Sequence, residues 1–63
     1  MEKFIRSLNI YDYAAFRDEC TRECRVTLQA WSTWRRGKVS VPAKYHETIN
    51  KVAEEMFGRK VFE

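Results

Sequence analysis

Residues 26–39, VTLQAWSTWRRGKV, combine two tryptophans, several small polar side chains and a basic end. Because Trp31 and Trp34 are three residues apart, a helix here would place both on one side. The opposite side would carry amide and hydroxyl groups, which can hydrogen-bond to DNA base edges, and the basic residues that follow could neutralise phosphates. This spacing favours core packing of the tryptophans over base stacking. The stretch thus resembles a core-packed helix whose free face meets a phosphate-lined groove.

Basic residues are concentrated in the middle of the chain. The net charge is only +3, but residues 25–51 contain six basic residues against a single acidic one, Glu47. A basic segment in an otherwise near-neutral chain indicates a surface that binds a polyanion. The alternative is an ordinary solvated helix face, because such faces are often rich in lysine and arginine as well. Charge alone therefore leaves nucleic-acid binding and simple solvation both open.

Apolar residues recur at helical spacing, and no stretch has the alternation of a strand. The predicted helices cover residues 2–8, 13–24, 28–36 and 42–57. The boundary residues that support these limits are Asn9, Asp12, Thr27, Gly37, Pro42 and Gly58. We therefore predict one all-α domain of four or five short helices over residues 1–63.

Two of these helices have a clear apolar face. In the second helix the face consists of Tyr13, Phe16, Cys20 and Cys24. In the fourth helix it consists of Tyr45, Ile49, Val52, Ala53, Met56 and Phe57. The tail, residues 59–63, contains Val61 and Phe62, which we expect either to fold back onto the core or to meet a partner chain.

The second and third helices meet the requirements of a helix-turn-helix, in which two helices cross steeply and a short turn joins them. The unit would cover about residues 13–36. If Arg17 is the first of twenty positions, the apolar positions fall on Cys20, Cys24, Val26, Trp31 and Trp34. Thr21 takes the crossing position, and Arg25 takes the turn position that is often glycine. A left-handed Arg25 would cost about 1 kcal/mol relative to glycine.

The run VTLQAWSTWRRGK, followed by an apolar helix that opens at Pro42, resembles the phage repressor and Cro-like family of helix-turn-helix regulators. The resemblance covers about residues 17–58, and its most informative part is the ending Trp34-Arg-Arg-Gly-Lys38. Thr21 and Arg25 depart from the family pattern. The resemblance implies a lambda repressor-like fold and sequence-specific binding of double-stranded DNA.

The family pattern also implies roles for the matching positions. The base-reading positions are Leu28, Gln29, Ser32 and Thr33. Gln29 is the best candidate among them, because a primary amide can pair bidentately with adenine. The phosphate-binding positions are Arg17, Thr27, Arg35, Arg36, Lys38 and Lys44. Arg17 is expected at the start of the second helix, where the helix N-terminus would also favour an anion. Simple solvation remains the alternative for Arg17, Ser32, Thr33 and Lys44.

Other chemistries have less support. Cys20, Cys24 and the single histidine, His46, fall short of the four ligands of a structural zinc site, so we expect reduced, buried thiols and no metal or cofactor. No nucleophile has an identifiable base, so we expect neither an enzyme nor a small-molecule substrate. The main alternative is a helix-turn-helix-shaped module that binds another protein, whose exposed face would be apolar or acidic.

The sequence has no run of about 18 apolar residues and no secretory pattern, so we expect a cytoplasmic protein that does not span a membrane. A single recognition helix buries little surface, and we therefore expect a homodimer on a palindromic site, formed through the fourth helix and the tail. The resulting hypothesis is a small transcriptional regulator of phage or mobile-element type.

Overall fold

The computed structural model describes residues 1–37 and 39–62. The described residues form α1 (Glu2–Arg6), α2 (Ile10–Cys24), α3 (Leu28–Arg35), the 3-10 helix η1 (Ala43–Tyr45) and α4 (His46–Phe57). No strand occurs among them, so the predicted all-α class is confirmed. None of the helices in this part of the chain has the length and the apolar content that crossing a membrane requires.

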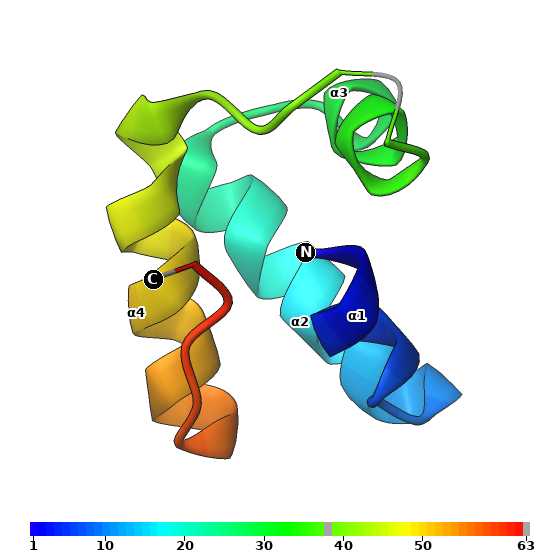
Figure 1. The fold of residues 1–63 in the computed structure, drawn as a ribbon, viewed down its shortest axis with the longest axis vertical. Helices are drawn as coiled ribbons and strands as arrows, with labels where there is room; N and C mark the ends of the chain where they lie inside the picture. Colours follow the sequence, from blue (N-terminus) through cyan, green and yellow to red (C-terminus); the bar gives the residue numbers. More distant parts are fainter. Residues whose placement is uncertain (38, 63) are drawn as a thin grey trace.

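The longest helix, α2, is the central element of the fold (Figure 1). It packs chiefly against α4 and also contacts α3. In Figure 1, α2 and α4 extend across the view, whereas α3 is seen nearly end-on. The axis of α3 is therefore steeply inclined to the axis of α2.

The start of α2 differs from the prediction. Asn9 is the N-cap, because its side chain accepts a hydrogen bond from the Asp12 backbone N–H at 2.8 Å. This satisfied cap starts the helix at Ile10 and not at Tyr13. Arg17 consequently lies in the middle of α2, and its predicted place at a helix N-terminus is wrong. α1 ends at Arg6 and not at residue 8, since the chain must turn into the extended conformation of the cap.

A three-residue connection joins α2 to α3. Arg25, at the predicted turn position, has a left-handed conformation, with φ 55° and ψ 44°. The Val26 N–H donates to the Thr21 carbonyl at 3.1 Å and closes the end of α2. Thr27 then caps α3 as predicted, because its hydroxyl oxygen accepts from the Ala30 N–H at 3.1 Å. These short-range contacts fix how α3 leaves α2.

The fourth helix was predicted to open directly at Pro42, but Pro42 is an extended cap that precedes η1, and α4 begins at His46. Gly58 ends α4 with a positive φ of 70°, and Gly37 follows α3 with a φ of 78°. Both glycines thus end helices as predicted. Met56, predicted on the apolar face of α4, is 36% exposed. It lies at the edge of that face, beside an open groove between α2 and α4.

All four α-helices contribute to one core. Its buried residues are Ile5, Phe16, Cys20, Trp31, Ile49, Val52 and Ala53. The Phe16 ring joins the helices, because its centroid lies 5.2 Å from that of Phe4 and 5.9 Å from those of Trp31 and Phe57. Trp31 is 1% exposed and Trp34 is half-buried, so the prediction that both tryptophans pack inward is confirmed.

The described part of the tail folds back onto the core, one of the two predicted arrangements. The Asn50 side chain holds it: the amide oxygen accepts from the N–H groups of Val61 (2.9 Å) and Phe62 (2.7 Å), and the amide nitrogen donates to the Phe62 carbonyl (2.7 Å). The Phe62 ring stacks on His46 with centroids 3.9 Å apart. Glu63 lies outside the described residues.

Asn50→Ala should destabilise the fold by about 2 kcal/mol, because three partly buried backbone groups lose their partner at once. Urea unfolding followed by circular dichroism measures this change. Glu54→Ala is the matched control, since it removes only the exposed ion pair of Glu54 with Lys60 and should cost less than about 0.5 kcal/mol. Equal effects of the two substitutions would contradict the role given to Asn50.

Candidate nucleic-acid interface

The outer face of α3 carries the residues predicted to read bases. Leu28 is 58% exposed, and Gln29 and Ser32 are also exposed, whereas Trp31 faces the core. Within the described residues, the side chains of Gln29 and Ser32 make no hydrogen bond with another residue, so their polar groups remain available to a ligand. Thr33 differs: it is half-buried, and its hydroxyl donates to the Gln29 carbonyl at 3.0 Å. Thr33 is therefore the least available of the four.

The residues predicted to bind phosphate occupy several positions. Arg35 and Arg36 are exposed at the end of α3, and neither forms an ion pair with another described residue. The Thr27 hydroxyl accepts from a backbone N–H as the cap of α3. Lys44 lies on η1 with its ammonium 5.1 Å from the centroid of the adjacent Tyr45 ring. Lys38 lies outside the described residues.

A groove of about 500 Å³ runs between α2 and α3. Its lining residues are Ile10, Tyr13, Ala14, Arg17, Leu28, Ser32 and Arg35. The groove therefore brings together two of the predicted base-reading residues, Leu28 and Ser32, and two of the predicted phosphate-binding residues, Arg17 and Arg35. Lys44 and Thr27 do not line this groove. Gln29, Thr33 and the C-cap residue Arg36 do not line it either, and these three follow one another at helical spacing.

The groove contains one aromatic residue that the sequence pattern did not place at the surface. Tyr13 was predicted on the buried stripe of the second helix, but it is half-buried and its ring lies at the groove. Its hydroxyl accepts a hydrogen bond from Trp31 Nε1 at 3.1 Å. The guanidinium carbons of Arg35 and Arg17 lie 5.0 and 5.8 Å from the ring centroid. The four-residue spacing to Arg17 could have indicated one of these contacts, but the contact with Arg35 depends on tertiary structure.

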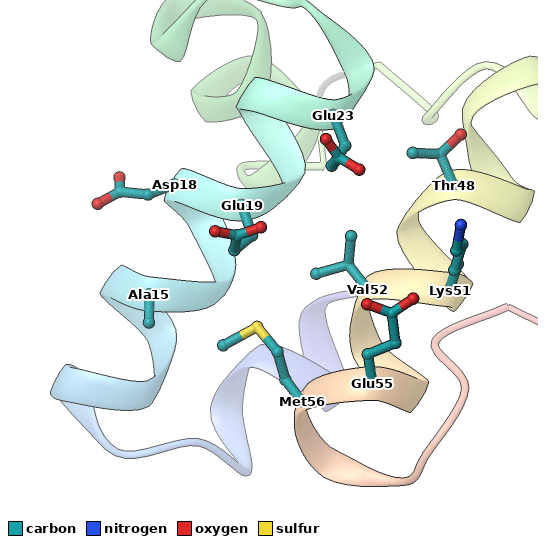
Figure 2. A pocket seen from close by; sticks show the side chains of 9 residues that line it. All are labelled: Ala15, Asp18, Glu19, Glu23, Thr48, Lys51, Val52, Glu55 and Met56. Carbon is teal, nitrogen blue, oxygen red and sulfur yellow. The ribbon is translucent and has the colours of Figure 1, made fainter.

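A second groove, of about 570 Å³, lies between α2 and α4 and has the opposite charge. Its charged lining residues are Asp18, Glu19, Glu23, Lys51 and Glu55. Figure 2 shows Glu19 and Glu23 on the side of α2 that faces Met56 and Lys51 of α4. α2 thus carries Arg17 toward one groove and carboxylates toward the other. A polyanion would be repelled from the α2–α4 groove and attracted to α3.

The two cysteines are free thiols. Burial, followed by the nearby Cys24 and Glu19, raises the pKa of Cys20 to about 12. Burial, helped by Glu23, also raises the pKa of Cys24. Both thiols are therefore protonated at neutral pH, and neither is a ready nucleophile or metal ligand. Among the described residues, no three His, Cys, Asp or Glu side chains are grouped in a way that could hold a metal ion.

No protein-family model, curated protein or solved structure matches the chain. The function must therefore be inferred from the chemistry and geometry of this surface.

Proposed function

We propose that the chain binds double-stranded DNA sequence-specifically, with α3 as a recognition helix in the major groove. One observation carries this proposal: α3 is fixed to the core by Trp31 and presents the polar groups of Gln29 and Ser32, with Arg35 and Arg36 at its end, and none of these four side chains has a hydrogen-bond or ion-pair partner among the described residues. The amide and the hydroxyl can hydrogen-bond to base edges, and Arg35 and Arg36 can neutralise phosphates. A small transcriptional regulator of phage or mobile-element type would use such a surface.

The arrangement of α2 and α3 supports a helix-turn-helix of the lambda repressor-like kind. A short connection with a left-handed Arg25 joins the two helices, and α3 is steeply inclined to α2 (Figure 1). The acidic groove on the other side of α2 would repel DNA, so electrostatics would orient the protein with α3 toward the duplex. A single α3 offers a small interface, so we propose that two copies bind a palindromic site.

Selection of a random duplex library on the purified protein tests this proposal. An enriched palindrome is the expected result, and the spacing of its half-sites would report the geometry of the dimer. Retention of duplexes without enrichment would contradict sequence-specific binding. No retention at low salt would contradict DNA binding altogether.

A protein-interaction module is the second candidate function, and one observation favours it. Three large apolar side chains at the starts of α2 and α3 are exposed: Ile10 (76%), Tyr11 (83%) and Leu28 (58%). Ile10 and Leu28 also line the groove. An exposed apolar group of this kind is typical of protein contacts. Failure of the protein to retain any duplex would favour this function.

Gln29→Ala should relax the preference at one base position of the selected site, at a cost of about 1–3 kcal/mol on the preferred sequence. The physical reason is the loss of a primary amide that can pair with adenine. Binding to a panel of single-base variants of the site measures the effect. Arg36→Ala is the control, because loss of a phosphate contact should weaken binding to every duplex alike. A uniform loss for Gln29→Ala would show that Gln29 does not read a base.

A further inference from the structure

We infer that Tyr13 is a positioning residue, which holds Arg17 and Arg35 as a pair of guanidinium groups that clamp a backbone phosphate of DNA in the α2–α3 groove. This inference rests on the proposed function and deepens it. It assigns a DNA-binding role to a tyrosine that neither the sequence pattern nor the family resemblance places at the interface.

The core fixes the position of the Tyr13 ring. Trp31, which is 1% exposed, donates a hydrogen bond from Nε1 to the Tyr13 hydroxyl at 3.1 Å. The ring is only half-buried and lines the groove between the two helices. Tyr13 therefore connects the packed core to the surface where a ligand would bind.

Both arginines lie within the distance at which a guanidinium is attracted to an aromatic ring. The guanidinium carbon of Arg35 is 5.0 Å from the ring centroid of Tyr13, and that of Arg17 is 5.8 Å away. These two residues come from different helices, so the shared ring brings together charges that are far apart in the sequence. Arginine side chains lose rotamer entropy when they bind, and restraint by the ring lowers that loss.

The composition of the groove indicates an anionic ligand. The residues that line it include two arginines and no carboxylate. In the described part of the chain, the ion pair made by these arginines uses the Nε group of Arg17, which donates to Asp18 at 3.2 Å. Two positive charges that line the same groove repel each other, and an anion bound in the groove offsets that repulsion. The exposed apolar walls formed by Ile10 and Leu28 strengthen the field inside the groove. Because Ser32 and Arg35 belong to α3, a DNA phosphate is the ligand that suits this position.

The test compares Tyr13→Leu, which removes the ring, with Tyr13→Phe, which keeps it. The dissociation constant for duplex DNA is measured by fluorescence anisotropy over a series of salt concentrations. Tyr13→Leu should weaken binding by about five- to thirtyfold. The slope of its plot of log affinity against log salt concentration should decrease in magnitude by about one to two. Tyr13→Phe should keep the wild-type slope and bind within about twofold of wild type.

A mutant cycle separates positioning from a structural effect. In an Arg17→Ala/Arg35→Ala background, Tyr13→Leu should change affinity by less than about twofold, since the groups it positions are absent. An undiminished effect in that background would overturn the inference, as would a folded Tyr13→Leu protein with the wild-type slope. If Tyr13→Leu does not fold, the Arg17→Ala/Arg35→Ala protein decides: a slope shallower by about two supports the clamp, and an unchanged slope overturns it. Absence of binding by the wild-type protein would instead refute the proposed function itself.

Discussion

Replacement of Trp31 by alanine is expected to destabilise the fold by about 3–5 kcal/mol. Trp31 is 1% exposed, packs edge-on against Phe16 with centroids 5.9 Å apart, and donates its Nε1–H to Tyr13. The substitution therefore opens a cavity and removes a hydrogen bond at the only buried position of α3. Because small domains have little stability to lose, we expect the variant to be largely unfolded at room temperature.

Far-UV circular dichroism and urea unfolding measure the effect of Trp31→Ala. Leu28→Ala is the matched control on the same helix, because Leu28 is 58% exposed and its loss should change the unfolding free energy by less than about 0.5 kcal/mol. If the two variants were equally stable, the inward packing of α3 on Trp31 would be wrong.

The second large effect concerns pH. Burial raises the pKa of Cys20 from 9.0, the value expected in the unfolded chain, to about 12 in the folded protein. Between these values the unfolded chain releases the thiol proton while the folded protein retains it. The folded state then binds more protons, so its stability is complete below pH 9 and should fall as the pH rises above 9. The decrease should approach about 1.4 kcal/mol for each pH unit.

Unfolding free energies measured at several alkaline pH values in wild type and in Cys20→Ala test this prediction. Cys20→Ala lowers the starting stability through its cavity, but it removes this thiol from the titration, so its stability should fall less steeply. All other side chains are the same in the two proteins, so their contributions cancel in the comparison. Parallel curves for the two proteins would contradict the raised pKa of Cys20.

Local chemistry explains which parts of the fold could be predicted from the sequence. The Thr27 cap, the turn at Arg25 and the terminal Gly58 each depend on a few neighbouring residues, and all three were predicted. The predicted start of α2 was wrong because Asn9 and Asp12 are both good cap residues. Only the hydrogen bonds between them show that Asn9 caps the helix.

In the candidate interface, too, local features could be predicted from the sequence, whereas contacts between helices could not. The exposure of Leu28, Gln29 and Ser32 follows from the burial of Trp31 and helical periodicity, so this face could be predicted from α3 alone. The position of Tyr13 between two arginines could not, because Arg35 reaches the ring only when α3 is folded against α2. The carboxylates of the α2–α4 groove likewise come from two helices and gather only in the folded protein.

The most direct test of DNA binding by α3 is a titration of ¹⁵N-labelled protein with duplex DNA, followed by amide chemical shifts. We predict that the largest shifts occur in α3 and at the α2–α3 groove, with amides of the acidic α2–α4 groove nearly unchanged. Absence of any shift at low salt, or shifts confined to the α2–α4 groove, would contradict the proposed recognition helix.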